Sequence, residues 1–115
     1  MEYSEMSKGM RRRLRELAEE AMAGRLHPFL QRLNEDFRSW ERGEIQDLEL
    51  DSRIGAFTRG PSRKLGAEYA ELKPDILVAK AVALGSLDPE VVDEEILEIL
   101  GPMIEGLRSI FAEDD

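Results

Sequence analysis

Residues 76–84, ILVAKAVAL, form an uninterrupted apolar run in which Lys80 is the only polar residue. A helix that is apolar on all sides has to be enclosed by other elements, because a helix at a protein surface keeps a polar face. Gly85 follows the run, and glycine commonly ends a helix in the left-handed conformation. Pro74 precedes it at a position that suits the first turn of a helix. The run therefore predicts a central helix around which the rest of the domain packs.

The segments on either side of this run also show a helical period. The apolar residues before it recur at intervals of 4, 3, 4 and 3 residues, the spacing of one helix face: Leu26, Leu30, Leu33, Phe37 and Trp40. No stretch alternates apolar and polar residues as a half-buried strand does. Aromatic residues make up only 6% of the chain, so the core must be mainly aliphatic, a composition that favours helix over sheet. We expect an all-α fold.

Glycine and proline divide the chain into short helical segments. Gly24 and Pro28 predict a kink or break between residues 24 and 28, because an interior proline loses a hydrogen bond and clashes one turn back. Gly43 is expected to end the next helix, and Gly101-Pro102 to kink or split the last one. These divisions predict a compact bundle of five to seven short helices, some of them kinked at glycine or proline.

The 115 residues are enough for one domain with a modest core, of which residues 1–8 and 112–115 are expected to fray. The net charge of −9 is unevenly spread: residues 1–64 carry 13 Lys and Arg against 12 Asp and Glu, whereas residues 65–115 carry 3 against 13. This acidic half repels phosphates, so we expect a basic protein rather than nucleic acid as a partner. The alternative is that acidic helix faces only keep the protein in solution.

Several chemistries are missing from the sequence. The absence of cysteine excludes disulfides, thiolate metal sites and thiol nucleophiles. His27, the only histidine, precedes a proline in the expected kink, which suits a helix end better than catalysis. We therefore expect no catalytic residue and no cofactor. The N-terminus has no apolar signal core and no run reaches membrane-spanning length, so we expect a cytoplasmic protein without membrane contact.

Carboxylates at helical spacing leave one enzymatic alternative open. Some all-α nucleotide pyrophosphatases bind magnesium through Glu-x-x-Glu on one helix and Glu-x-x-Asp on the next. The chain contains Glu16 with Glu19, and Glu44 with Asp47. Acidic residues three apart occur seven times in the chain, against about five expected by chance. Glu44 also falls in an expected turn, where it would not share a helix face with Asp47. The spacing of these carboxylates is therefore the only feature of the sequence that supports this alternative magnesium site.

The basic run at residues 11–15, RRRLR, is the strongest patch of one sign. It could bind nucleic acid, but few aromatic residues accompany the arginines to stack on bases. Glu16, Glu19 and Glu20 follow at helical spacing and can pair with them. We favour an exposed, charge-balanced helix face and keep nucleic-acid binding as an alternative.

Phe37 and Trp40 continue a seam at heptad spacing that begins at Leu30 and Leu33. Such a stripe is most often part of a core. It spans only two heptads, too few to establish a coiled coil, and Trp is enriched at the centres of interfaces. Self-association through this seam stays open beside the core interpretation.

Gly60-Pro61 is the strongest helix-ending signal in the middle of the chain. If a helix begins at Pro61, its free N–H groups, together with Arg63 and Lys64, could bind an anion. A phosphate-binding loop normally has several glycines, and this one has a single glycine. We therefore favour a helix junction in which Arg59 or Arg63 pairs with an acidic helix of the C-terminal half.

Residues 49–65, ELDSRIGAFTRGPSRKL, resemble a segment found in a group of small bacterial all-helical proteins. The residues that carry the resemblance are Glu49, Leu50, Ile54, Phe57, Gly60, Pro61, Ser62, Arg63 and Leu65, extended by Tyr69. Trp40 and the RGEI of residues 42–45 add to it. Members of this group often carry His where this chain has Gly55 and Thr58, so any chemistry of those histidines is missing here. The resemblance implies a helical fold and no particular activity.

The leading hypothesis is a non-enzymatic helical protein-interaction or small regulatory protein. It would act through its acidic C-terminal half or through the seam that ends at Trp40. The candidate interaction residues are Phe37, Trp40, Arg59, Ser62 and Arg63. The alternatives are a magnesium-dependent nucleotide hydrolase and nucleic-acid binding through residues 11–15.

Overall fold

The computed structural model describes residues 1–113, and within them every regular element is a helix, which confirms the all-α prediction. The α-helices are α1 (Lys8–Glu41), α2 (Asp47–Phe57), α3 (Arg63–Glu71), α4 (Pro74–Leu84) and α5 (Glu94–Glu113). Short 3-10 turns cover Tyr3–Glu5 and Pro89–Val91, and a π-helical turn covers Thr58–Ser62. Among the helices of this described part, none is long and apolar enough to cross a membrane.

Prolines lie inside the helices rather than between them, so the helices are fewer and longer than the sequence predicts. Pro28 lies inside α1, Pro61 inside the π turn and Pro102 inside α5. The backbone is helical on both sides of the π turn, with φ −62° and ψ −47° at Phe57 and φ −65° and ψ −42° at Arg63. Helices α2 and α3 are therefore one continuous rod. The described residues form four rods instead of five to seven helices, and the helix start expected at Pro61 is wrong.

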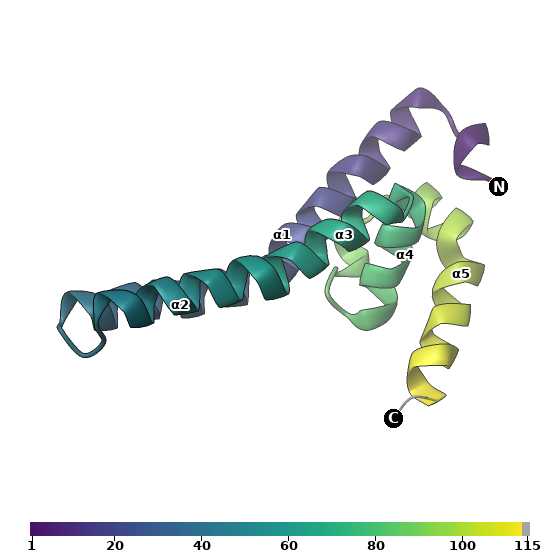
Figure 1. Ribbon diagram of the computed structural model, residues 1–115. Helices are drawn as coiled ribbons and strands as arrows, with labels where there is room; N and C mark the ends of the chain where they lie inside the picture. Colours follow the sequence, from purple (N-terminus) through teal and green to yellow (C-terminus); the bar gives the residue numbers. More distant parts are fainter. Residues whose placement is uncertain (114–115) are drawn as a thin grey trace.

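Local geometry explains how the prolines are accommodated. The π turn is wider than an α turn, so it leaves room for the ring of Pro61 and omits a bond that proline cannot donate. In α1 the ring of Pro28 crowds the carbonyl of Gly24 one turn earlier. The helix bends between its two halves (Figure 1) and does not break, so of the expected kink or break only the kink is present. Helix α5 likewise continues through Pro102 without being split.

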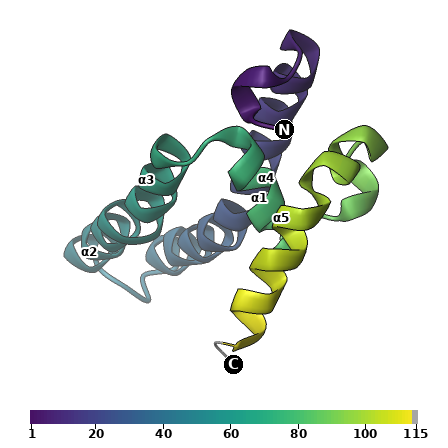
Figure 2. The ribbon, with the colours of Figure 1, turned by 90° about the vertical axis from the view of Figure 1, so that its right-hand side faces the viewer.

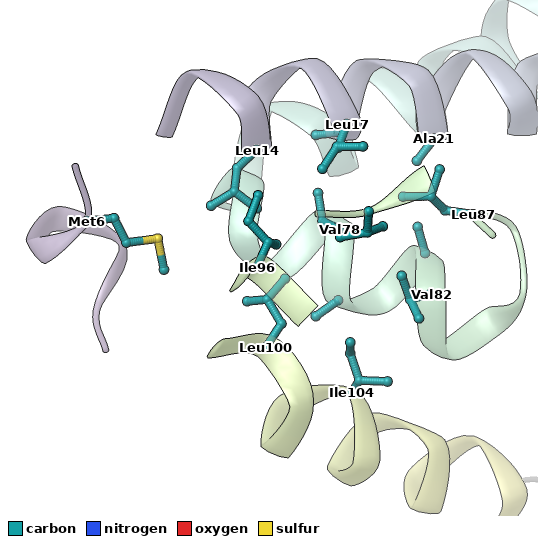
Figure 3. Close-up of a cluster of buried hydrophobic side chains, with 14 residues drawn as sticks. Met6, Leu14, Leu17, Ala21, Val78, Val82, Leu87, Ile96, Leu100 and Ile104 are labelled. Atoms are coloured by element: carbon teal, nitrogen blue, oxygen red, sulfur yellow. The ribbon is translucent and has the colours of Figure 1, made fainter. Parts of the chain in front are cut away.

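Helix α4 occupies the centre of the core, as its apolar sequence predicts. Figure 3 shows Leu14 and Leu17 of α1, Val78 of α4, and Ile96 and Leu100 of α5 meeting in one buried cluster. Each of these side chains is almost completely buried. The core therefore lies between α4, α5 and the N-terminal half of α1.

The chain ends and helix ends can be compared with the sequence expectations. Fraying was expected over residues 1–8; in the structure Tyr3–Glu5 form a 3-10 turn and the side chain of Met6 is buried in the core cluster. At the other end, α5 includes Ala112, and residues 114–115 lie outside the described residues. Gly43 and Gly85 follow α1 and α4 with φ of +76° and +79°, so both end helices in the left-handed conformation as expected.

The C-terminal half of α1 and helix α2 run antiparallel and extend away from the core (Figures 1 and 2). We call this two-helix hairpin, with the π turn at its inner end, the arm (residues 26–62). The molecule measures 54 × 34 × 25 Å, and its radius of gyration of 17.7 Å exceeds the value of about 13 Å for a compact domain of this length. The bundle is compact only around the core, and the arm accounts for the long axis.

Candidate interaction site

The outer end of the arm is a tight connection between α1 and α2. Gly43 in the left-handed conformation reverses the chain, and the N–H of Glu44 donates to the carbonyl of Ser39 at 2.9 Å. The indole N–H of Trp40 donates to Oδ1 of Asp47 at 2.7 Å, which joins the last turn of α1 to the first turn of α2. These bonds fix the register of the hairpin.

Ion pairs hold the middle of the arm together. Arg53 on α2 donates to Asp36 on α1 at 2.7 Å, and also to Glu49 one turn earlier on its own helix at 3.0 Å. The other polar contact inside this part of the rod is local, from the hydroxyl of Thr58 to the carbonyl of Ile54 at 3.0 Å. The two helices of the arm are therefore linked by charged and polar contacts at its outer end and its middle.

Apolar side chains of the arm remain largely in contact with solvent. Leu50 is the one buried side chain between residues 22 and 64 of the described chain. The seam that the sequence predicts is half-exposed: 44% of Leu30, 37% of Phe37 and 40% of Trp40 are accessible to solvent, and Leu33 is half-buried. Phe29, on the same helix, is 38% exposed. A core would cover such side chains almost completely. Of the two interpretations left open by the sequence, the structure favours a surface seam over a core.

A groove of about 360 Å³ opens between the two helices on one side of the arm. It is lined by Phe29, Arg32, Leu33, Asp36, Arg53, Ala56, Phe57 and Pro61. Apolar side chains provide most of its surface, and within the described residues Arg32 makes no ion pair. The groove can accept an apolar side chain of a partner, with a guanidinium at its edge for a carboxylate.

The two ends of the arm carry opposite charge. We call residues 41–51 the tip; they contain five acidic residues and one arginine. We call residues 58–64, where the arm continues into α3, the base; they contain Arg59, Arg63 and Lys64 and no acidic residue. None of these three cations forms an ion pair within the described residues. The arm thus has a negative outer end and a positive inner end.

The expectations for the Gly60-Pro61 segment are corrected in two respects. Neither Arg59 nor Arg63 pairs with the acidic C-terminal half in the described structure; instead the guanidinium of Arg59 folds back over Gly55. The backbone continues as a helix through Pro61, so no helix begins there. The free N–H groups that were expected to bind an anion at a helix N-terminus are therefore missing. Ser62 is half-buried at the end of the π turn.

The ion pairs that connect α3 to other helices involve other residues. Glu68 on α3 accepts from Arg25 of α1 at 2.9 Å and from Lys80 of α4 at 2.6 Å. Burial raises the pKa of Glu68, but the hydrogen bonds from Lys80 and Arg25 outweigh it and hold that pKa below its ordinary value. Arg25 is 43 residues and Lys80 12 residues away from Glu68 in the sequence. No local sequence pattern predicts contacts between residues so far apart.

The four carboxylates of the alternative magnesium site lie in two separate places. Glu16 and Glu19 are on the N-terminal half of α1, whereas Glu44 and Asp47 are at the tip. The 22 residues of helix between Glu19 and Glu41 correspond to about 33 Å. The structure does not bring the two pairs together, and in the described residues no group of three or more Asp, Glu or His side chains is placed to hold a metal ion.

The basic run at residues 11–15 is partly paired, as expected. Arg13 donates to Asp93 at 3.2 Å and to the carbonyl of Val91 at 3.2 Å, which ties α1 to the start of α5. It also lies 3.4 Å from Glu16. Arg15 donates to the hydroxyl of Tyr3 at 3.3 Å. Part of the charge of this run therefore serves contacts within the chain.

Comparisons with known proteins add no relative. No protein-family description matches the chain, and no curated protein sequence or solved structure is significantly similar to it. The functional conclusion therefore depends on the geometry of the chain itself.

Proposed function

We propose that this chain is a non-enzymatic helical interaction protein whose binding element is the arm. The observation that carries the proposal is the exposure of five large apolar side chains along an arm in which one side chain is buried: Phe29, Leu30, Phe37, Trp40 and Leu48. Isolated helices of this length are marginal in water, because most helical stability in proteins comes from packing of an apolar face. An arm with so little buried surface gains stability when another protein covers it.

Two features of the arm match known properties of protein-binding surfaces. Trp40 and Phe37 lie in a row with polar and charged residues on either side, and aromatic residues are enriched at the energetic centres of interfaces. The groove lined by Phe29, Leu33 and Phe57 in the same arm offers a recess for an apolar side chain. The acidic C-terminal half presents a second surface, which favours a basic protein as an additional partner.

The proposal is tested by affinity capture from the host organism with matched baits. The unmodified chain and the Val91→Ala variant should recover the same protein, since Val91 is 42% exposed and lies outside the arm. The double variant Phe37→Ala, Trp40→Ala should lose that protein while keeping its helical circular dichroism. Equal recovery by all three baits would show that the arm is not the binding element.

A further inference from the structure

The chain exposes more surface than a compact protein of its mass. Its accessible surface is 7947 Å², whereas a folded monomer of 13.1 kDa has about 6,400 Å². The excess is on the order of 1,500 Å², and a stable protein–protein interface covers about 800 Å² on each partner. One partner of ordinary size would therefore cover about half of the excess.

The arm can supply an interface near the lower size limit for a specific contact. Residues 26–41 of α1 give it a length of about 24 Å, and two helices side by side are about 20 Å wide. One face of the arm is then about 500 Å² in projection, and two such faces together give about 1,000 Å², the lower limit for a specific interface. Two helix hairpins that pack face to face through their exposed apolar side chains also complete a four-helix bundle, which is a common way to bury such side chains.

The charge of the arm indicates what covers it. The acidic tip and the basic base lie at opposite ends of the arm, so two arms that pack antiparallel place each tip beside the partner's base. Parallel packing would instead place two tips together, with five acidic residues and one arginine on each. Like charges brought together disfavour an arrangement, and opposite charges favour it. The arm is therefore complementary to a second copy of itself in one orientation.

We propose that two copies of this chain form a dimer by antiparallel packing of their arms into a four-helix bundle. The contact is isologous and closes on two copies, because the same face serves on both. Phe37 and Trp40 lie in the interface, and Arg59, Arg63 and Lys64 face the partner's tip. This inference rests on the proposed function, since both take the arm as the binding element, and it adds the identity of the occupant.

The association state is measured by sedimentation equilibrium from about 1 µM to about 500 µM. The unmodified chain and Val91→Ala, a control at a 42% exposed side chain outside the arm, should form a dimer. Trp40→Ala should raise the dissociation constant by about 30-fold or more, as expected for a side chain at the centre of an interface. Raising the ionic strength from about 0.05 M to about 1 M should weaken the dimer, because salt screens the contact between tip and base.

Each remaining outcome overturns the dimer or its site. A monomer at every concentration overturns the dimer; if affinity capture still depends on the arm, the proposed function stands without it. A dimer that Ile110→Ala weakens and Trp40→Ala does not would place the interface on the exposed apolar residues of α5 instead. A dimer that is insensitive to both would exclude the arm as well.

A charge-reversal experiment tests the orientation. The base-reversed variant carries Arg59→Glu, Arg63→Glu and Lys64→Glu, and the tip-reversed variant carries Glu41→Lys, Glu44→Lys and Asp51→Lys. Neither should dimerise alone, whereas their equimolar mixture should form a heterodimer, because a fully acidic arm then meets an arm made basic at both ends. If each variant dimerises alone as well as the unmodified chain does, the antiparallel arrangement is wrong.

A distance measurement gives an independent test. The chain has no cysteine, so Gln46→Cys places a single spin label at the tip. Antiparallel arms separate the two labels of a dimer by the length of the arm, about 24 Å or more. Labels near the spacing of adjacent helices, about 10 Å, would show parallel arms and overturn the proposal.

Discussion

The indole N–H of Trp40 donates a hydrogen bond of 2.7 Å to the carboxylate of Asp47, across the connection between α1 and α2. The same indole is 40% exposed, so the residue that fixes the register of the hairpin also presents an apolar surface to solvent. A side chain held in one position before binding loses less conformational freedom when a partner covers it. Under the proposed function, this bond holds Trp40 in the position that a partner protein covers.

Replacing Asp47 should loosen the tip without unfolding the core. Asp47→Ala removes the acceptor for Trp40 and an acidic group in the first turn of α2, so we expect a loss of about 1–2 kcal/mol in the free energy of unfolding. Urea unfolding followed through the fluorescence of the single tryptophan reports it. Asp51→Ala is the matched control, because Asp51 forms no ion pair in the described structure; equal losses in both variants would contradict the role of the bond.

The Glu68 ion pairs predict a dependence of stability on pH. The pKa of Glu68 is lowered in the folded protein, so its charged form stabilises the fold above the unfolded value near 4.5. This contribution is lost as the pH falls through the lower pKa of the folded state. Glu68→Gln should cost about 1–3 kcal/mol at pH 7, because it leaves Arg25 and Lys80 without their carboxylate.

The difference in unfolding free energy between the unmodified chain and Glu68→Gln should shrink toward low pH. Urea unfolding of both proteins from about pH 7 to about pH 3 measures it. Other carboxylates titrate in both proteins and cancel in the comparison. A difference that stays constant over this range would mean that the charge of Glu68 is not what stabilises the contact.

Truncation in the core and truncation on the arm should differ sharply. Leu17 is completely buried against α4 and α5, so Leu17→Ala should cost about 3–4 kcal/mol through lost burial and a cavity. Leu48→Ala should cost less than about 0.5 kcal/mol, because that side chain is 84% exposed. Thermal unfolding by calorimetry compares them, and similar losses would contradict the placement of the core.

The bend in α1 gives a prediction about Pro28. The residue is exposed and lies inside the helix, where a proline costs up to about 3 kcal/mol relative to alanine. Pro28→Ala should therefore raise the free energy of unfolding by about 1–3 kcal/mol in urea. A loss of stability would show that packing at the base depends on the bend itself.

The sequence predicted those features that depend on local pattern. The enclosed run at residues 76–84 became the central helix, and Gly43 and Gly85 end helices where expected. The breaks expected at proline are wrong, because a local cost of about 3 kcal/mol does not by itself end a helix. The backbone continues through Pro28 as a bent helix and through Pro61 as a π turn, and one sequence does not show whether a proline ends a helix or is accommodated in it.

The candidate site was predicted only in part. The seam through Phe37 and Trp40 was identified as core or interface, and spacing alone cannot separate the two, because both need an apolar stripe. What separates them is that α4 packs on the other half of α1, which follows from the tertiary arrangement. The contacts of Glu68 with Arg25 and Lys80 join distant segments in the same way.

Hydrogen exchange at two protein concentrations, one below and one above the dissociation constant, tests most directly whether a second copy covers the arm. The amides of residues 26–62 should exchange more slowly at the higher concentration, whereas those of α4 (Pro74–Leu84) should exchange at the same rate in both. Arm amides that exchange at one rate at every concentration would contradict the claim that the arm binds a second copy.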